Sequence, residues 1–320
     1  MQPIAVVNPW SGVVDYQFVP PTADELAAEA ARLRRAQLAW RNQTLGHRVD
    51  VLSRFREALL ARREPITAAL AADTGRHLVA VAEVLGTAGA IDRWCRQAPA
   101  LMAEADGRSI QTPSIRYRNQ WVPYALVGVI SPWNFPLTLA LIDAIPALLA
   151  GCAVLIKPSE ITPRFVEPLA EAIAAVPELA EVLSFRPGAG ETGAQLVTLV
   201  DAVCFTGSVR TGRIVGEAAA RAFIPAFLEL GGKDPAIVTA SADLERAAIA
   251  IVRGSVLANG QACQSLERVY VHESVYEDFV ARVVARASAV TINWPDPAKG
   301  VSGPFIWARQ GVVVQQQIND

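Results

Sequence analysis

The sequence predicts an α/β protein built on a doubly wound parallel sheet, and three observations support this. Short apolar runs alternate with helical stretches from about residue 124 onward, as strands alternate with crossover helices in such sheets. The stretches between the runs, such as 161–176 and 208–222, have the composition of helices. Hydrophobic residues make up 52% of the 320 positions and charged residues 19%, which suits a large buried core.

The N-terminal part predicts several amphipathic helices over 22–105, because it is rich in Ala, Leu, Arg and Glu and has few β-branched runs. Thr22 or Asp24 is expected to cap the first helix, and Gly75 to mark a break. The pattern changes over 107–123, where an alternating segment carries Thr, Tyr, Trp and Pro. This segment predicts an extended hairpin that leaves the compact domain.

Five apolar runs are the strand candidates: YALVGVI (124–130), CAVLIK (152–157), VLSF (182–185), AVCFTG (202–207) and PAIV (235–238). A longer apolar run, 135–156, has 22 positions and is open to two interpretations. It is either a membrane helix or a buried helix that runs into a buried parallel strand. Asp143, Pro146 and Gly151 interrupt the run, which favours the second interpretation.

Charge and cysteine usage exclude several classes of protein. The net charge is −2 and the Lys and Arg residues are scattered, so no basic patch for nucleic acid is expected. The four cysteines form no CxxC pair and the three histidines are dispersed, which argues against a metal site and a disulfide framework. The first residues show no basic and apolar signal segment, so a reduced cytoplasmic setting is expected.

Three segments after strand candidates could bind a nucleotide, and each has a plain structural alternative. Gly188, Gly190 and Gly193 form a GxGxxG pattern, which an ordinary turn explains about as well. Gly207 and Ser208 end a strand and open a helix, where backbone amides could meet a pyrophosphate or Ser208 could simply cap the helix. The segment KPSE (157–160) could hold ribose hydroxyls or form a solvated turn.

Three further segments carry residues suited to catalysis. Asn134 lies between aromatic residues and prolines in PWNFP (132–136), and such a rigid loop could present its amide to an oxyanion, although a turn-forming Asn is the alternative. Glu229 ends an apolar segment beside two glycines. Cys263 has the polar neighbours Asn259, Gln261, Gln264 and Ser265, which suits an accessible, reactive thiol, whereas Cys95, Cys152 and Cys204 suit small buried hydrophobes.

In this order, the motifs PWNFP (132–136), KPSE (157–160), FTGS (205–208), LELGGK (228–233) and GQAC (260–263) resemble the aldehyde dehydrogenase superfamily. Each motif is moderately specific, and five in this order are very specific. The resemblance extends from the opening NPWSG to GPFIWARQ and so covers essentially the whole chain. It implies the aldehyde dehydrogenase fold, with a Rossmann-like NAD-binding domain and the start of a second α/β catalytic domain.

The resemblance implies a role for each catalytic candidate. Cys263 attacks an aldehyde, and the Asn134 side chain and the Cys263 backbone N–H hold the oxyanion. Hydride passes to the nicotinamide, and Glu229 is the general base for hydrolysis of the resulting thioester. The presence of Glu229 implies a free-acid product, because members that pass the acyl group to coenzyme A tend to lack that base.

The resemblance also implies the cofactor site. Glu160 on the adenosine ribose favours NAD, with NADP as an alternative, since a 2′-phosphate would meet a like charge. The residues implied in cofactor binding are Trp133, Lys157, Ser159, Glu160, Gly190, Gly193, Gly207, Ser208, Leu230 and Gly231.

The chain departs from complete relatives because it ends before their Glu-x-Phe-Gly-Pro motif, so a C-terminally truncated member is expected. The expected division is an NAD(P)-binding domain (1–106 and 124–229), an oligomerisation hairpin (107–123) and a partial catalytic domain (230–320). A homodimer or homotetramer is expected for the full-length protein. Two alternatives stay open: a CoA-acylating semialdehyde dehydrogenase, and a non-catalytic fragment that only binds nucleotide or a partner subunit.

Overall fold

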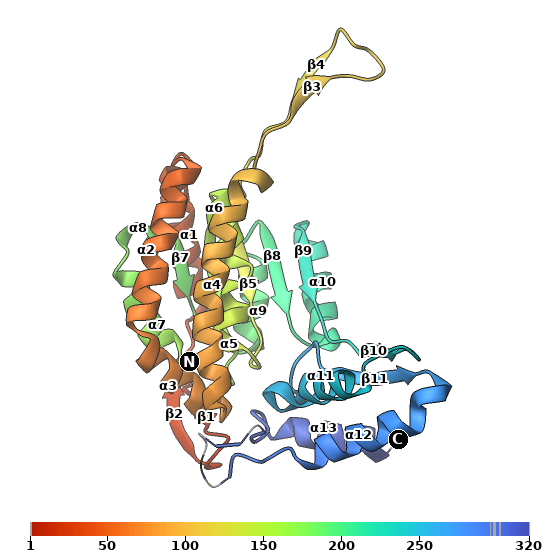
Figure 1. The fold of residues 1–320 in the computed structure, drawn as a ribbon. Helices are drawn as coiled ribbons and strands as arrows, with labels where there is room; N and C mark the ends of the chain where they lie inside the picture. The colour runs from red at the N-terminus through yellow and green to blue at the C-terminus, as the bar shows by residue number, and fades with distance from the viewer. Residues whose placement is uncertain (1, 295, 297–298, 301, 320) are drawn as a thin grey trace.

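The centre of the molecule is a five-stranded parallel sheet with the strand order β7-β6-β5-β8-β9 (Figure 1). The computed structural model describes residues 2–294, 296, 299–300 and 302–319. The strands are β5 (Leu126–Ile130), β6 (Ala153–Lys157), β7 (Leu183–Phe185), β8 (Ala202–Thr206) and β9 (Ala226–Glu229). The first of these strands in the sequence, β5, lies in the middle of the sheet; β6 and β7 extend the sheet on one side of it, and β8 and β9 on the other. This order confirms the predicted doubly wound fold.

The two middle strands explain why the sheet forms. Every residue of β5 and β6 is buried, as expected for strands covered on both faces. Gly128 in β5 allows close packing, since a Cβ there would lie 2.3 Å from a methyl carbon of Leu196.

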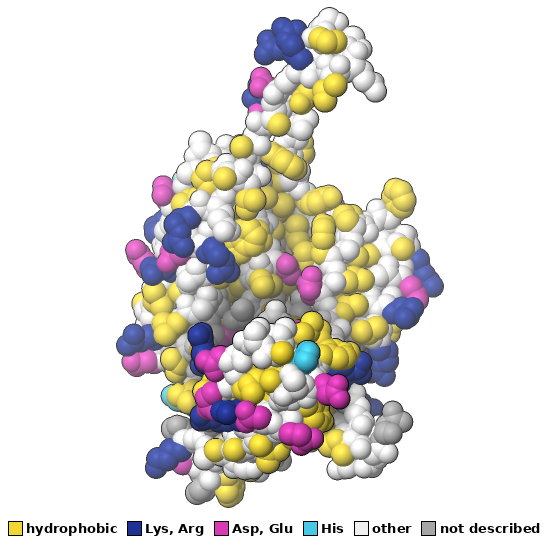
Figure 2. Space-filling model, turned by 45° about the vertical axis from the view of Figure 1, so that its right-hand side comes forward, with side chains coloured by type: hydrophobic (Ala, Val, Ile, Leu, Met, Phe, Trp, Pro, Cys, Tyr) yellow, Lys and Arg dark blue, Asp and Glu magenta, His cyan; other side chains and the backbone are white. Residues whose placement is uncertain are grey.

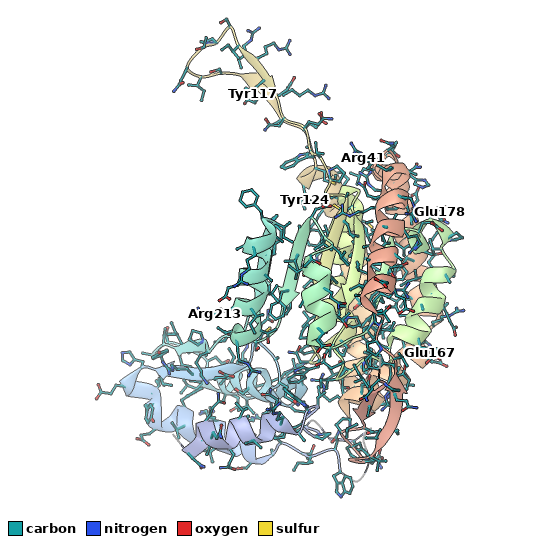
Figure 3. The ribbon with its side chains drawn as sticks, turned by 180° about the vertical axis from the view of Figure 1, so that it is seen from behind. Arg41, Tyr117, Tyr124, Glu167, Glu178 and Arg213 are labelled. Carbon is teal, nitrogen blue, oxygen red and sulfur yellow. The ribbon has the colours of Figure 1, made fainter. Side chains whose placement is uncertain are left out.

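Helices cover both faces of the sheet (Figures 1 and 3). One set comprises α1 (Ala23–Trp40), α9 (Gly190–Val197) and α10 (Val209–Ala222), and the other includes α4 (His77–Leu101), α6 (Ala144–Ala150) and α7 (Val166–Ala174). The remaining helices of this part are α2 (Leu45–Ala61), α3 (Arg63–Thr74), α5 (Pro136–Leu141) and α8 (Pro177–Ala180). The expected cap is confirmed, because Thr22 accepts from Glu25 N while the Glu25 carboxylate accepts from Thr22 N.

The apolar run 135–156 contains α5, α6 and the start of β6, so its interpretation as buried helix followed by buried strand is confirmed. Gly151 ends α6 with a φ of 97°, a conformation that favours glycine. Among the residues that the structure describes, none of the helices has both the length and the apolar content that a bilayer crossing requires.

Two antiparallel hairpins flank the central sheet. One joins β1 (Ile4–Val7) to β2 (Val14–Phe18) near the N-terminus. The other joins β3 (Asp106–Arg108) to β4 (Arg116–Arg118) and projects far from the body, with Tyr117 on it and Tyr124 near its base (Figures 1 and 3). An extended hairpin in this segment matches the expectation from the sequence.

A second, smaller layer follows the central sheet. It has the parallel strands β10 (Asp234–Val238) and β11 (Leu266–Val271), packed against α11 (Leu244–Val256) and α12 (Tyr276–Ser288). Ile237 and Tyr270 are register partners and are 77% and 53% exposed. Figure 2 shows hydrophobic side chains gathered on the face of the molecule above this layer. The short helices η1 (Leu257–Gly260) and η2 (Glu273–Val275), and the final helix α13 (Arg309–Asn319), complete the chain.

Candidate active site

The predicted site residues follow the carboxyl ends of the central strands. Because all five strands are parallel, the loops that follow them emerge at one edge of the sheet. The order of the strands reverses between β5 and β8, which is where open α/β sheets bind their ligands. By strand, the candidates are Trp133 and Asn134 after β5, Gly188 to Gly193 after β7, and Gly207 and Ser208 after β8. Lys157 is the last residue of β6 and is followed by Ser159 and Glu160, and Glu229 is the last residue of β9 and is followed by Leu230 and Gly231.

The Asn134 side chain reaches the loop that carries Cys263. Its Nδ2 donates to the backbone oxygen of Gln261 at 2.9 Å, and its Oδ1 accepts from Phe135 N at 3.2 Å. Asn134 and Gln261 are 127 positions apart in the sequence. The amide-bearing loop and the thiol-bearing loop are therefore in direct contact, and the Asn134 side chain does more than shape its own turn.

Cys263 lies between η1 and β11 and is exposed, whereas Cys95 and Cys152 are buried and Cys204 is intermediate. Burial raises the pKa of the Cys152 thiol to about 11 and that of Cys204 to about 12. These two thiols are therefore protonated at neutral pH and unreactive. The loop before Cys263 is held by Ser265, whose hydroxyl donates to the Gly260 oxygen at 3.1 Å.

The segment that carries Glu229 approaches the same loop at Gly232. A Cβ placed on Gly232 would lie 3.7 Å from the Cys263 carbonyl oxygen. Glu229 itself is exposed at the end of β9, and its backbone oxygen accepts from Gly207 N at 3.0 Å. Burial, with the charge of Glu229 as a smaller cause, raises the pKa of Asp143, so the two carboxylates lie near each other.

Lys157 connects two of the predicted nucleotide-binding segments. Its side chain is buried, and its Nζ donates to the Gly188 oxygen at 2.7 Å while lying 3.5 Å from a carboxylate oxygen of Glu160. Burial lowers the pKa of Lys157, and the charge of Glu160 opposes that shift. A Cβ on Gly193 would touch the Lys157 chain at 3.5 Å, so the GxGxxG loop packs on this lysine. The solvated-turn interpretation is thus wrong for Lys157.

The other candidates near this edge have mostly structural contacts of their own. Ser208 caps α10 by accepting from Thr211 N at 3.2 Å. Ser159 Oγ accepts from Ile161 N at 3.2 Å, and the Trp133 oxygen accepts from the Thr162 hydroxyl at 3.2 Å. Leu230 packs on α10 beside Gly212. A Cβ would meet nothing within 4 Å at Gly190 or Gly231, so both leave open space beside the backbone.

Arg76 is a buried residue at this site that the sequence did not reveal. It lies between α3 and α4, after Gly75, whose φ of 65° confirms the predicted break. Its guanidinium donates to the Asn134 oxygen and, at 3.1 Å, to the Ala258 oxygen. These partners are 58 and 182 positions away, so no local pattern signals them.

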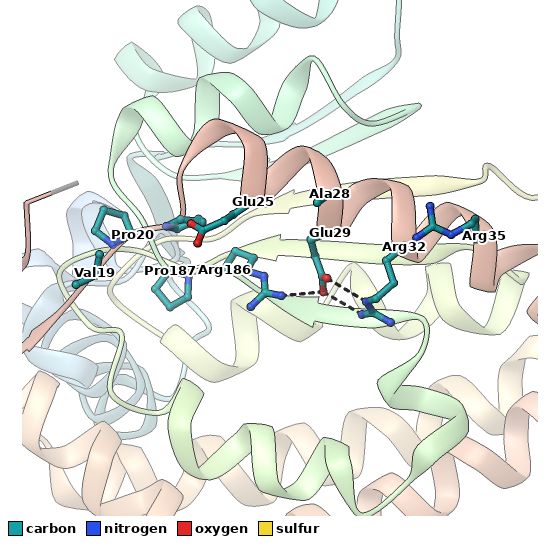
Figure 4. A pocket seen from close by; sticks show the side chains of 10 residues that line it. Val19, Pro20, Glu25, Ala28, Glu29, Arg32, Arg35, Arg186 and Pro187 are labelled. Carbon is teal, nitrogen blue, oxygen red and sulfur yellow. Dashed lines mark hydrogen bonds and ion pairs between the residues drawn. The ribbon is translucent and has the colours of Figure 1, made fainter.

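A separate hollow of about 690 Å³ lies beside β7 and the start of α1 (Figure 4). Glu29 lies within it between Arg32 and Arg186, at 2.9 and 3.1 Å. The hydrogen bonds from Arg32, with smaller contributions from Ser184 and the charge of Arg186, lower the pKa of Glu29 to about 2 despite its burial. This ion cluster fastens α1 to the sheet. In the described part of the chain, no group of three or more His, Cys, Asp or Glu residues could hold a metal ion.

Comparison with known proteins shows the family. The family profile described as the aldehyde dehydrogenase family matches residues 1–320. The chain belongs to the aldehyde dehydrogenase family. A solved structure of the PutA protein from Anabaena variabilis is 50% identical, superposes with a TM-score of 0.96, and is matched over 100% of this chain and 68% of that one.

The curated relatives of this aldehyde dehydrogenase are less similar in sequence than the PutA protein is. The 4,4′-diapolycopene aldehyde oxidase of Methylomonas sp is 33% identical over 328 residues, which cover 100% of this chain and 61% of the relative. The succinate-semialdehyde dehydrogenase [NADP(+)] 1 of Mycobacterium tuberculosis is 33% identical over 329 residues, covering 99% of this chain and 70% of the relative. The chain thus spans between three fifths and three quarters of the length of these three proteins.

Proposed function

We propose that the protein oxidises an aldehyde to the carboxylic acid with NAD as hydride acceptor and NADP as an alternative. The observation that carries the proposal is the 2.9 Å hydrogen bond from the Asn134 amide to the loop of the exposed Cys263. It supports a site where a thiol and an oxyanion donor serve one carbonyl group. The mycobacterial relative is named for NADP, which agrees with a nicotinamide cofactor.

In the proposed reaction, the Cys263 thiolate adds to the aldehyde carbon, and the oxygen takes the negative charge. The Asn134 amide and the Cys263 N–H stabilise that oxyanion. A nicotinamide cofactor, held by the residues named in the next paragraph, would supply the hydride acceptor that allows the carbonyl to re-form. The product is a thioester on Cys263. Glu229 then takes a proton from water as the water oxygen attacks the thioester carbon, and the C–S bond breaks to release the acid and the Cys263 thiolate.

The chain offers suitable groups for the cofactor. Lys157 and Glu160 present a donor and an acceptor side by side, as the hydroxyls of a ribose require. Gly207 and Ser208 begin α10, where a helix N-terminus favours a phosphate. The bare backbone at Gly190 leaves room for close approach. Trp133, Ser159, Gly193, Leu230 and Gly231 complete the proposed set.

We also propose the domain division expected from the sequence, with 1–106 and 124–229 binding the cofactor, 107–123 contacting a second copy and 230–320 forming part of the catalytic domain. The exposed hairpin supports the second role, because Ile115 and Tyr117 are 56% and 50% exposed. Sedimentation of the protein with and without residues 107–123 tests this role. A loss of assembly is the expected result.

Substitution of Cys263 by alanine tests the proposed function. Cys263→Ala is expected to abolish aldehyde-dependent formation of reduced nicotinamide, because no other group replaces the thiolate. Cys204→Ala is the matched control and is expected to keep activity. Full turnover by Cys263→Ala would rule out the assigned nucleophile. A strict need for coenzyme A would favour the acylating alternative, and calorimetric NAD binding without oxidation of any aldehyde would favour the non-catalytic one.

A further inference from the structure

We propose that Arg76 is a positioning residue that fixes the Asn134 loop relative to the Cys263 loop. The proposal rests on the proposed function, since it concerns the same two loops. Among the described residues, the hydrogen bonds of Arg76 go to backbone oxygens of the two loops, so its proposed role is to place the loops.

The guanidinium bridges the two loops directly. One terminal nitrogen donates to the carbonyl oxygen of Asn134, the residue that presents the amide. The other donates to the carbonyl oxygen of Ala258 at 3.1 Å, in the turn that leads to Cys263. The carbon of the guanidinium also lies 5.3 Å from the centre of the Phe135 ring. Arg76 thereby holds one loop by a carbonyl and a ring, and the other by a carbonyl.

Arg76 is an unusual choice for packing alone. It is 4% exposed, and burial lowers its pKa to about 10, so it is still a cation at neutral pH. A buried charge is destabilising unless it is well paired, and here the hydrogen-bond acceptors are neutral carbonyl oxygens. Its Nε has no hydrogen-bond partner in the part of the chain that the structure describes. Glu83, whose charge when ionised opposes that lowering of the pKa, accepts from Thr138 N at 3.3 Å at the start of α5.

The loops need an external brace because one of them is strained. Ala258 and Asn259 have φ angles of 55° and 63°, a region that residues other than glycine seldom adopt. The strain is balanced by contacts: Asn259 Nδ2 donates to the Pro304 oxygen at 2.9 Å, and Asn259 Oδ1 accepts from Gly303 N at 2.6 Å. Arg76 adds a contact to Ala258 itself. A planar fork of five donors suits two carbonyls in different directions, which a single ammonium does less well.

The contacts of Arg76 affect catalysis through the distance between the Asn134 amide and the Cys263 N–H. The oxyanion must lie within hydrogen-bond reach of both the Asn134 amide and the Cys263 N–H, so small shifts between the loops weaken both bonds together. A misplacement of about 1 Å lowers rates by roughly 10²-fold. Arg76 is the residue whose removal allows that shift without altering either catalytic side chain.

The test compares Arg76→Met and Arg76→Lys with a matched control, Arg48→Met. Arg48 is also a buried guanidinium that donates to two backbone carbonyls, Leu149 and Gln43, each at 2.7 Å, but it lies between other elements. For each variant we would measure Tm, kcat and KM for an aldehyde, and amide hydrogen exchange of peptides covering 131–136 and 257–265. Where Arg76→Met does not fold, Arg76→Gln replaces it.

Arg76→Met is expected to lower kcat by about 100-fold with KM changed less than about threefold, and to speed exchange in both loops together. Arg76→Lys is expected to restore kcat only to within about tenfold of wild type, because its ammonium can donate to the carbonyls but lacks the planar fork that reaches both. Arg48→Met is expected to lower Tm while kcat and loop exchange stay at wild-type values. Unchanged exchange in either loop of Arg76→Met, or equal loss of kcat in Arg48→Met, overturns the proposal. Absence of turnover in the wild type instead refutes the proposed function, and the exchange data still decide the role of Arg76.

Discussion

The two sheets of this protein differ in how they hold the residues of the proposed site. The five-stranded sheet buries β5 and β6 completely; Asn134 follows β5 and Lys157 ends β6, and helices cover both strands on both faces. The two-stranded sheet leaves Ile237 and Tyr270 exposed, and the nearby Cys263 lies in an exposed loop. The proposed oxyanion and cofactor groups are thus fixed by a deep core, whereas the proposed nucleophile depends on a few specific contacts between the two sheets.

Removal of the contact between the two sheets has the largest expected effect. Asn134→Ala is expected to lower kcat for aldehyde oxidation by 10²–10³-fold, which is about 3–4 kcal/mol, because the oxyanion loses its side-chain donor. Steady-state kinetics measures it, with the exposed Asn42→Ala as control. A kcat within a few-fold of wild type would mean that Asn134 only shapes its turn.

Matched truncations in the two sheets measure the difference in burial. Leu155→Ala in β6 removes a side chain that is 0% exposed and is expected to lower the free energy of unfolding by about 3 kcal/mol through the cavity that it leaves. Ile237→Ala in β10, where the side chain is 77% exposed, is expected to change it by less than about 0.5 kcal/mol. Urea denaturation gives both values, and equal losses would show that the second sheet is covered in solution.

The buried Glu83 carboxyl, in a helix that covers the five-stranded sheet, makes the free energy of unfolding depend on pH. Burial raises its pKa to about 7 from an ordinary value of 4.5, so the folded protein holds this proton more tightly than the unfolded chain does. Its contribution to stability is therefore fully present below about pH 4.5 and is lost as pH rises to about 7, up to about 3 kcal/mol. Glu83→Gln is expected to flatten that slope in denaturation experiments across this range. An unchanged slope would contradict the assignment.

The smallest effect separates the two interpretations of Ser208. Since its hydroxyl is used by Thr211 N, Ser208→Ala is expected to destabilise α10 by about 1 kcal/mol and Ser208→Gly by only a few tenths. The calorimetric Kd for NAD is expected to change less than about threefold in both, because backbone amides meet the pyrophosphate. A tenfold weaker Kd in both variants would instead assign the side chain to the cofactor.

Patterns in the sequence predicted the inner strands of the central sheet but not its exposed edge strand β9. The runs that became β5, β6, β7 and β8 are apolar because these strands are largely buried, and burial is what a hydropathy pattern reports. The run that became β10 was also predicted, although Ile237 in it is exposed. The strand β9 was not predicted, since three of its four residues are exposed at the sheet edge. The strands β1, β2 and β11 were also missed, and their mixed polarity is typical of partly exposed strands.

The proposed site shows the same limit. Asn134, Glu229 and Cys263 were found because each lies in a distinctive local motif, and the motifs resemble one family. Arg76 was not singled out; only its neighbour Gly75 was, as a break between helices. The partners of Arg76 belong to loops that are far apart in the sequence and meet only in the folded protein. Because Arg76 bonds to backbone oxygens, which every residue has, no particular residue type in the sequence reveals its partners.

The left-handed turn at Ala258 and Asn259 has a consequence for engineering the protein. A non-glycine residue in this conformation is disfavoured by about 1 kcal/mol or more, so Ala258→Gly would relieve that energy. The same change would widen the range of shapes open to the turn before Cys263. Ala258→Gly would then raise the melting temperature and also make the position of the Cys263 thiol less defined. Selection for thermostability alone would therefore move this loop away from the geometry that catalysis needs.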